Sequence, residues 1–390
     1  MPTLIVPDRV RERLERSCEV PLSLCPVPAE LFDGAIVTLT SRKSELLALA
    51  VVDRGAACWR VMARGEASGD ALDARWAETR LGEAVAARAP FGLAATPDSA
   101  YRLLNGAGDF TPGVLADVYG AWAVVSALSE AQVPAAQVLA QGIVDRGLAR
   151  GVVVKRRARG RAADGPGVVT VLGEAPPERP VVSEGPRRFE VHLTTGVNVG
   201  LFTDMRLERA RIAQVASGRR VLNLFAYTGA FSVAALGSGA ASVTSVDLSE
   251  GVLAWARDNV ALNGLAADRH HIAAADAGRF LEAAAAREER YDLVLVDPPS
   301  FSSARDAAFT VGRDYAAIMT AACRVLAPGG ALWLATNTRG FSLVGAAQLA
   351  AVEVGRQAQV VAMGGLPPDY PTELSDAEAR YLQTCLLRLT

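Results

Sequence analysis

The stretch from Val221 to Leu265 constrains the fold of this chain more than any other part of the sequence. It opens with the apolar run "VLNLF", breaks at "YTG", continues as a helix-like run, and reaches a lone acid, Asp247, at the end of a second β-branched run. A strand, a glycine-containing turn, a helix and an acid at the next strand end are typical of proteins that bind a nucleoside. The sequence therefore predicts a nucleoside-binding α/β unit here.

Strand-like and helix-like runs alternate from residue 187 to the C-terminus. This alternation predicts an α/β fold, with a mostly parallel seven-stranded sheet covered by helices on both faces. We expect strands at 189–194, 220–225, 242–246, 269–273, 292–296, 330–335 and 382–389, and helices at 204–216, 229–237, 249–262, 276–287, 308–326 and 343–354.

The first half of the chain shows a different pattern of expected strands and helices. Residues 30–64 cluster β-branched and apolar residues between polar breaks, which predicts a small β-rich module followed by a helix over 69–88. Strands and tight turns follow, around a helix at 130–148, and a proline-rich connector ends this part. We therefore expect a β-rich domain with a trailing helix at 1–85, a middle α+β domain at 86–186 and the α/β domain at 187–390.

Composition narrows the function classes. No apolar run reaches the roughly 18 residues that span a membrane, and the polar N-terminus lacks a signal-peptide core, so a soluble cytoplasmic protein is expected. The five cysteines are scattered and there are only three histidines, which argues against a disulfide framework and against a bound metal. The net charge of −2 means that any nucleic-acid contact must depend on local basic patches.

The predicted strand ends point to S-adenosylmethionine (SAM). Gly229 permits close backbone approach at the turn, the Asp247 carboxylate can accept two ribose hydroxyls, and Asp276 can face an adenine amino group. For Asp276 a plain helix N-cap is the alternative. One glycine, where nicotinamide and flavin sites use G-x-G-x-x-G, suits a cofactor without a pyrophosphate. The candidate cofactor residues from these strand ends are Phe225, Tyr227, Thr228, Gly229, Asp247, Leu248 and Asp276.

The fourth strand of this domain ends in "DPPSF", residues 297–301. Two prolines hold the backbone rigid after the acid, so the Asp297 carboxylate and nearby carbonyls project into a pocket, and Phe301 can stack beneath a flat ligand. A purely structural turn is the alternative. We take Asp297, Pro298 and Phe301 as candidate catalytic residues, with Asp297 also at the cofactor.

Several motifs resemble those of a known family: "YRLLNGAGDFTPGVLADVYGAWAVV", "TTGVNVGLFTDMRLERARI", "VLNLFAYTGAFSVAAL", "VDPPSF" and "EARYLQTCLLRL". From about residue 100 onward the chain resembles bacterial ribosomal RNA methyltransferases of the large-subunit cytosine-C5 type, which carry a PUA-like RNA-binding domain. The resemblance implies a Rossmann-like class I methyltransferase domain, SAM as cofactor and 23S ribosomal RNA as partner. It also implies that Phe202, Asp204 and Arg206 lie against the cofactor.

One part of the family pattern is missing. Cytosine-C5 enzymes attack the base with a cysteine after the fifth strand, but Thr336, Asn337, Thr338 and Arg339 stand there. The stretch "PPSFSSARDAAF…LWLATNTRGF" instead resembles the N7-guanine methyltransferase half of fused bifunctional ribosomal enzymes. That chemistry needs no thiol, so we expect guanine N7 as target and Asn337 as a catalytic residue. Cytosine C5, a small-molecule substrate and a non-catalytic RNA-binding role stay open as alternatives.

The run "KRRARGR" at 155–161 is the clearest candidate for backbone contacts to RNA. The alternative is a solvated loop that does not contact RNA. The sequence does not distinguish a monomer from a homodimer. The predicted RNA-binding residues are Lys155, Arg156, Arg157, Arg159 and Arg339.

Overall fold

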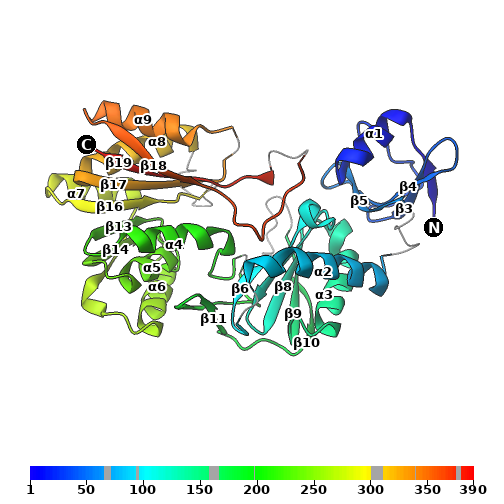
Figure 1. Cartoon of the computed structure of the whole chain (residues 1–390), viewed down its shortest axis with the longest axis horizontal. Coiled ribbons are helices and arrows are strands. Elements are labelled where there is room, and N and C mark those ends of the chain that lie inside the picture. The colour runs from blue at the N-terminus through cyan, green and yellow to red at the C-terminus, as the bar shows by residue number, and fades with distance from the viewer. Residues whose placement is uncertain are drawn as a thin grey trace. The chain divides into compact units, whose positions relative to one another are not determined.

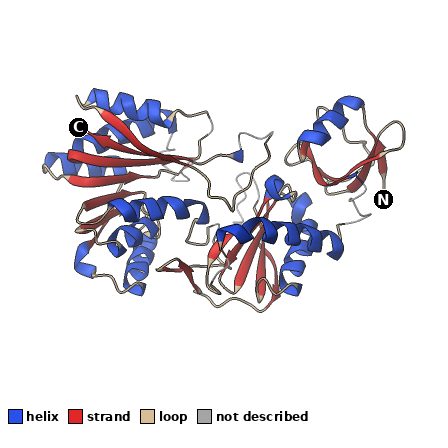
Figure 2. Ribbon diagram, viewed as in Figure 1, coloured by secondary structure: helices blue, strands red, loops and turns tan. Residues whose placement is uncertain are grey.

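The computed structural model describes residues 1–65, 72–93, 96–157, 167–196, 198–299, 311–338, 340–374 and 379–390. The chain divides into two compact units, each shown in Figures 1 and 2. The first unit is Met1–Ser183, Val191–Val199 and Pro368–Ala379, and the second is Glu184–Glu190, Gly200–Pro367 and Arg380–Thr390.

The N-terminal part of the first unit is a five-stranded sheet with the order β1-β3-β4-β5-β2, around a core that contains the fully buried Trp59. This agrees with the β-rich module expected from the sequence. Its elements are β1 (Thr3–Ile5), α1 (Asp8–Arg16), β2 (Glu19–Pro21), β3 (Ile36–Thr40), β4 (Leu46–Asp53) and β5 (Cys58–Arg64).

A second five-stranded sheet in the same unit has the order β10-β9-β8-β7-β6, and all its pairs are antiparallel except β8 with β9. Helix α2 contributes Trp76, Leu81 and Ala84 to the core of this second sheet. The boundary expected at residue 85 therefore falls inside a helix that packs with the middle domain. The elements are α2 (Ala74–Arg88), β6 (Ala100–Asn105), β7 (Val114–Tyr119), β8 (Trp122–Ala127), α3 (Val133–Asp145), β9 (Gly151–Arg156) and β10 (Val168–Gly173).

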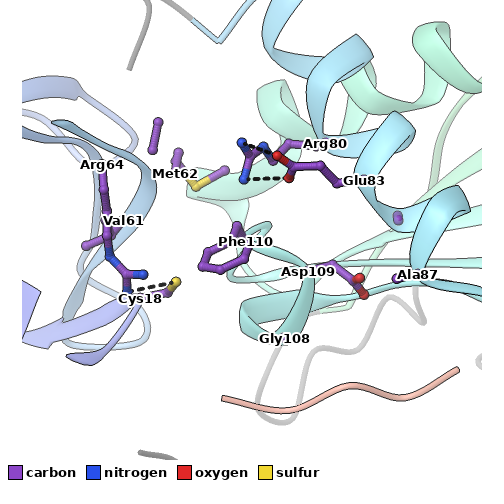
Figure 3. A pocket seen from close by; sticks show the side chains of 12 residues that line it. Cys18, Val61, Met62, Arg64, Arg80, Glu83, Ala87, Gly108, Asp109 and Phe110 are labelled. Carbon is purple, nitrogen blue, oxygen red and sulfur yellow. Dashed lines mark hydrogen bonds and ion pairs between the residues drawn. The ribbon is translucent and has the colours of Figure 1, made fainter. Parts of the chain in front are cut away.

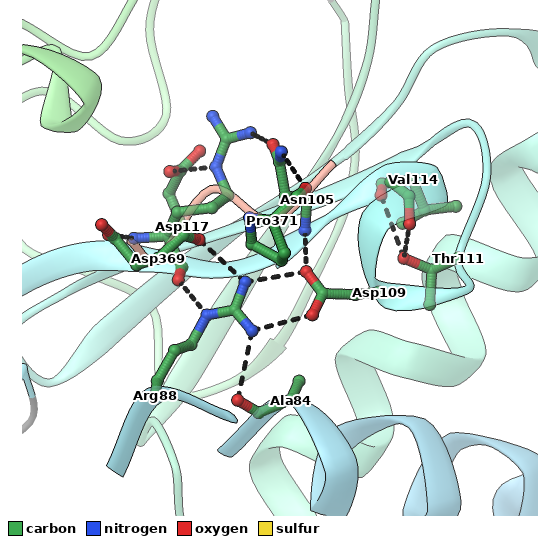
Figure 4. A network of polar contacts seen from close by, with 11 residues as sticks. Ala84, Arg88, Asn105, Asp109, Thr111, Val114, Asp117, Asp369 and Pro371 are labelled. Atoms are coloured by element: carbon green, nitrogen blue, oxygen red, sulfur yellow. Dashed lines mark hydrogen bonds and ion pairs between the residues drawn. The ribbon is translucent and has the colours of Figure 1, made fainter. Parts of the chain in front are cut away.

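A segment from the C-terminal part of the sequence completes the first unit. The Arg88 guanidinium donates to the Asp109 carboxylate at 2.7 and 2.8 Å and to the backbone oxygen of Asp369 at 2.8 Å. The Asn105 amide donates to the backbone oxygen of Pro371 at 2.9 Å (Figure 4). These bonds, of which that of Arg88 is buried and charge-assisted, hold the segment around Asp369 and Pro371 against the second sheet.

The second unit contains a seven-stranded sheet with the order β15-β14-β13-β16-β17-β19-β18. The five strands from β15 to β17 are parallel, and β19 runs antiparallel to both of its neighbours. Helices α4 (Arg206–Val215), α5 (Ala230–Gly237) and α6 (Glu250–Leu262) cover one face, and α7 (Ala277–Ala286), α8 (Val311–Val325) and α9 (Leu343–Glu353) cover the other (Figure 1). The strands are β13 (Arg220–Leu224), β14 (Ser242–Asp247), β15 (His270–Ala274), β16 (Tyr291–Val296), β17 (Leu326–Thr336), β18 (Ala358–Gly364) and β19 (Gln383–Leu389).

The central strands explain why this sheet was predictable. Val221, Leu222, Val294 and Leu295 are at most 1% exposed, because helices bury both faces of a parallel sheet. The α/β fold and its mostly parallel seven-stranded sheet are confirmed.

Two strands differ from expectation. The strand expected at 189–194 is absent from the seven-stranded sheet; β12 (Arg187–Glu190) pairs only with β11 (Val181–Glu184) in a small hairpin. The seventh strand is β18, which lies at the sheet edge with three consecutive exposed residues, 359–361. Its sequence, AQVVAMG, is an apolar run without the alternation of apolar and polar residues that marks a half-buried strand.

Among the described residues, none of the helices has the length and hydropathy needed to cross a membrane.

Candidate active site

The strand order of the seven-stranded sheet brings two motifs to the carboxyl ends of neighbouring strands. The chain runs outward from β13 to β15 and then returns to β16 on the other side of β13. Ligands of such sheets bind at the carboxyl ends of the strands where the order reverses. The turn Phe225–Gly229 follows β13, and Asp297 follows β16. The turn Phe225–Gly229 and Asp297 therefore lie on the two sides of the point where a ligand of such a sheet binds.

The turn after β13 has an uncommon backbone. Phe225, Tyr227 and Gly229 have φ angles of 56°, 48° and 74°, although only the last is a glycine. The Asp247 carboxylate holds this shape: Oδ2 accepts from the Tyr227 backbone N–H at 3.0 Å, and Oδ1 accepts from the Ser249 N–H at 3.1 Å. Each oxygen keeps a lone pair for a further donor, such as a ribose hydroxyl.

Gly229 is required by helix packing. A Cβ at this position would lie 2.7 Å from the Cβ of Ala256 on α6, and φ is positive. The close approach that we predicted at Gly229 is therefore an approach to α6. Thr228 is buried, and its hydroxyl donates to the backbone oxygen of Gly200 at 2.5 Å. Thr228 thus ties the turn to the stretch that contains Phe202.

Aromatic and apolar side chains lie beside the turn. The Phe202 and Tyr227 rings are 5.5 Å apart, and the Tyr227 and Trp255 rings are 6.4 Å apart. Phe202 and Leu248 are 46% and 63% exposed. Exposed apolar groups next to a carboxylate with free lone pairs are suited to cover the flat face of an adenine. The donor set and these apolar groups fit a bound SAM.

Asp276 caps α7. Its Oδ1 accepts from the Arg279 backbone N–H at 3.0 Å, and the residue is exposed. The capping role that we assigned to Asp276 is present in the structure. Its role toward adenine stays a prediction.

In the second unit, Asp204 interacts both with Tyr381 and with Asp297. The Tyr381 hydroxyl donates to Asp204 Oδ2 at 2.7 Å. The pKa of Asp297 is raised to about 7, chiefly by burial and also by the carboxylate of Asp204, while Arg209 opposes the rise. With this pKa, Asp297 gains and loses its proton near neutral pH.

Within the described part of the chain, no three His, Cys, Asp or Glu side chains gather in a way that could hold a metal ion.

The raised pKa of Asp297 predicts a pH-dependent cost to stability. The ordinary pKa is 3.8 and the folded value is about 7, so between these values the folded chain keeps a proton that the unfolded chain releases. The free energy of unfolding therefore falls as pH rises through this window. We expect Asp297→Asn to raise the melting temperature at pH 8 and to have little effect near pH 4.5. Thermal unfolding with Asp292→Asn as control tests this, and a pH-independent difference would contradict it.

Tyr315 on α8 is a residue of this site that the sequence did not reveal. Its side chain is fully buried, and its hydroxyl lies 2.6 Å from the Ala335 backbone oxygen and 3.2 Å from that of Val296. Val296 immediately precedes Asp297, and Ala335 lies two residues before Asn337. Tyr315 thus fixes the spacing of two strand ends that carry catalytic candidates. In the sequence it looks like one more apolar residue of a helix stripe.

Removing the Tyr315 hydroxyl should cost stability. Tyr315→Phe leaves two buried carbonyl groups without this donor, so we expect a loss of about 1–3 kcal/mol in the free energy of unfolding. Urea denaturation measures this. Tyr291→Phe is the control, because that hydroxyl donates to Glu289, a partly exposed side chain. Equal losses in the two variants would contradict a special role for Tyr315.

The other predicted residues lie as follows. Pro298 is buried, Asn337 is exposed just beyond β17, and Arg206 begins α4. Helix α4 is pinned to the sheet, since the Trp333 indole donates to Glu208 at 2.9 Å. Phe301 and Arg339 lie outside the described residues.

The cysteines are poorly suited to act as nucleophiles. All five are buried. Burial raises the pKa of Cys323 to about 11 and that of Cys385 to about 12. A thiol with such a pKa is almost entirely protonated at neutral pH, and the thiolate is the reactive form.

The described residues of the basic run, 155–157, lie in different environments. Lys155 is 1% exposed and donates to the backbone oxygen of Gly196 at 3.3 Å, so its ammonium is not presented to an RNA phosphate; we withdraw Lys155 from the RNA-binding set. Desolvation lowers its pKa to about 8. The Arg156 side chain is 42% exposed and pairs with Glu130 at 2.7 Å. Arg157 is partly buried, and Arg159 lies outside the described residues.

The fold and the strand-end acids define a class of α/β proteins that bind a nucleoside-containing cofactor where the strand order reverses. The family described as S-adenosylmethionine-dependent methyltransferase matches residues 128–380, which is more than half of the chain. The chain belongs to this family, and its cofactor is SAM. Over the full length of both chains, the fold is similar to that of a protein described as a methyltransferase and crystallised with SAH, the product of SAM, with a TM-score of 0.84 and 24% identity.

Two relatives share part of the sequence. The ribosomal RNA large subunit methyltransferase K/L of Chromohalobacter salexigens is 46% identical over 172 residues, 44% of this chain and 23% of that protein. The ribosomal RNA large subunit methyltransferase K of Neisseria meningitidis is 41% identical over 165 residues, 42% of this chain and 47% of that protein. The chain thus spans between about a quarter and a half of the length of these relatives.

Proposed function

We propose that this enzyme transfers the methyl group of SAM to a base of large-subunit ribosomal RNA, and that the acceptor atom is guanine N7. The identity to relatives named as ribosomal RNA large subunit methyltransferases supports the RNA substrate. Work on ribosomal RNA would place the enzyme in the cytoplasm.

The choice of guanine N7 over cytosine C5 rests on the cysteines. Methylation of cytosine C5 requires a thiolate that adds to the ring, whereas guanine N7 has a lone pair and reacts by direct displacement. Thr336 to Arg339 include no cysteine, and the thiols of Cys323 and Cys385 are buried with raised pKa values. These observations favour guanine N7 over cytosine C5.

The proposed roles follow the strand ends. Asp247 and Asp276 would hold the ribose and the adenine of SAM, with Phe202, Tyr227 and Leu248 against its apolar parts, and Asp204 and Arg206 toward its remaining polar groups. When bound, SAM supplies an electrophilic methyl group. The Asp297 carboxyl and the Asn337 amide together offer the acceptors and donors that the edge of an extruded guanine needs. Tyr315 keeps these two groups at a fixed separation.

Contacts to the RNA backbone are expected from the arginines of the basic run. Charge-neutralising changes at Arg156, Arg157 and Arg159 should weaken RNA binding broadly and flatten its salt dependence, since each lost phosphate contact lowers the slope by about 0.7–0.9. SAM affinity should not change. Filter binding at several salt concentrations tests this, with Arg269→Gln and Arg290→Gln of the other unit as control. An unchanged slope would mean that the run is a solvated surface.

The substrate itself is tested with ribosomal RNA from a deletion strain. Incubation with the purified enzyme and labelled SAM should place one label in the large-subunit RNA. Label in small molecules of the extract and none in RNA would contradict the proposed substrate.

A further inference from the structure

A cavity of about 390 Å³ lies in the first unit, between strand β5, helix α2 and the turn after β6. Its polar and aromatic lining includes Cys18, Arg64, Arg80, Glu83 and Phe110 (Figure 3). All of its lining residues belong to the first unit, and the strand ends at which we propose SAM binding belong to the second. The volume lies within the range of small-ligand sites and suffices for a nucleobase.

Phe110 is presented to this cavity by a rigid turn. It ends the 3₁₀ turn Gly106–Asp109 with a φ of 55°, a left-handed conformation that non-glycine residues rarely adopt, and it is 42% exposed. The turn is held by the Asp109 carboxylate, which accepts from Arg88 and from the Asn105 backbone N–H at 2.6 Å (Figure 4). An exposed ring on a backbone held in an unfavourable conformation is a feature of ligand sites.

Two guanidinium groups lie close to the Phe110 ring. The Arg64 and Arg80 central carbons each lie 5.6 Å from the ring centroid. The Nε atoms of both arginines are buried and have no hydrogen-bond partner among the described residues. Each guanidinium carries further N–H groups, and the Arg64 and Arg80 side chains are 31% and 13% exposed, so a ligand in the cavity can offer acceptor atoms to them.

The charges of the cavity exclude a bare anion as its ligand. Arg64 lies 3.4 Å from Glu373, and Arg80 lies 3.2 Å from Glu83, so each arginine is paired with a carboxylate. The fitting ligand is therefore flat, aromatic and uncharged, with oxygen or nitrogen acceptors at its edge. A nucleobase has these properties.

We propose that this cavity binds an unpaired nucleobase of the RNA substrate, stacked at Phe110 and accepting hydrogen bonds from the two arginines. It would be a second point of RNA contact, separate from the base that is methylated. The choice of an RNA strand rests on the proposed function.

The test compares the full-length protein with Phe110→Gly. Glycine suits the positive φ of this position, so the variant removes the ring without straining the turn. Binding of a single-stranded RNA of mixed sequence, labelled with 5-iodouridine, should weaken about tenfold or more, as expected for one lost base–aromatic stack. Phe32→Ala, which removes a 73% exposed ring that does not line the cavity, should bind as the wild type does.

Arg80→Lys separates planarity from charge. It keeps the positive charge but loses the flat guanidinium, so RNA binding should weaken several-fold with the salt dependence unchanged. Photo-crosslinking of the wild type should attach RNA to the peptide that contains Phe110. Equal RNA affinity of Phe110→Gly and Phe32→Ala, or crosslinks only at other peptides, would overturn the proposal.

The outcome is separable from that of the proposed function. If the wild type methylates no RNA but Phe110→Gly still weakens RNA binding tenfold, the proposed function fails and the nucleobase site stands. If the wild type methylates ribosomal RNA and Phe110→Gly binds and crosslinks normally, the site fails. Free adenosine that competes with RNA only in protein with an intact Phe110 would support the site, and free adenosine that binds where RNA does not would contradict it.

Discussion

Asp297→Ala is expected to lower turnover by about a hundredfold or more at saturating SAM and RNA. The carboxyl follows β16 at the point where the strand order reverses, and Tyr315 fixes the carbonyl just before it. Loss of a preorganised polar group that positions a reacting base typically costs on the order of 10²–10³ in rate. Asn337→Ala should give a loss of similar size, because it removes the proposed partner group on the neighbouring strand end. Single-turnover methyl transfer measures both effects.

Asp292→Ala is the matched control for Asp297. Asp292 stands at the other end of β16, where it accepts from the Arg220 backbone N–H at 2.8 Å. This change should cost some stability and leave turnover within about twofold, since surface hydrogen bonds contribute only modestly. A turnover of Asp297→Ala equal to that of Asp292→Ala would remove Asp297 from the catalytic set.

Asp247→Ala is expected to weaken SAM binding by at least tenfold. The carboxylate holds the Tyr227 and Ser249 backbone N–H groups and, in the proposed complex, also the ribose hydroxyls. Hydrogen bonds to a charged group contribute about 1.5–3 kcal/mol, and without the carboxylate the positive φ of Tyr227 has lost a restraint. Calorimetric titration with SAM measures the affinity.

The control for Asp247 is Asp268→Ala, which removes an exposed carboxylate from the loop before β15. Asp247→Asn adds a graded comparison, because it keeps one acceptor oxygen and loses the charge. We expect its affinity to lie between those of Asp247→Ala and the wild type. Unchanged SAM affinity in Asp247→Ala would place the ribose elsewhere.

The parallel core of the second unit was predictable because its strands are buried on both faces and end in recognisable polar motifs. Asp247, Asp276 and Asp297 lie at or just beyond strand ends, as the sequence pattern indicates. Local pattern alone was enough at these positions, since the alternation of strands and helices also dictates the side of the sheet on which each acid emerges.

Features that depend on distant partners were not predictable. Lys155 looks like part of a basic surface run, but β9 carries it into the interior beside Gly196. Tyr315 looks like an ordinary core residue until Val296 and Ala335 are placed beside its hydroxyl. Likewise, the bonds of Arg88 to Asp109 and Asp369 join residues up to 281 positions apart, and no periodicity announces such a contact.

The base that receives the methyl group tests the account most directly. Deletion-strain 23S ribosomal RNA is incubated with the enzyme and isotopically labelled SAM, digested to nucleosides and analysed by mass spectrometry. A parallel reaction with RNA that contains 5-fluorocytosine is examined for a covalent enzyme–RNA adduct. The account predicts labelled 7-methylguanosine, no adduct, and full activity in Cys323→Ala and Cys385→Ala variants that fold. Labelled 5-methylcytidine, together with an adduct that one cysteine replacement abolishes, would contradict it.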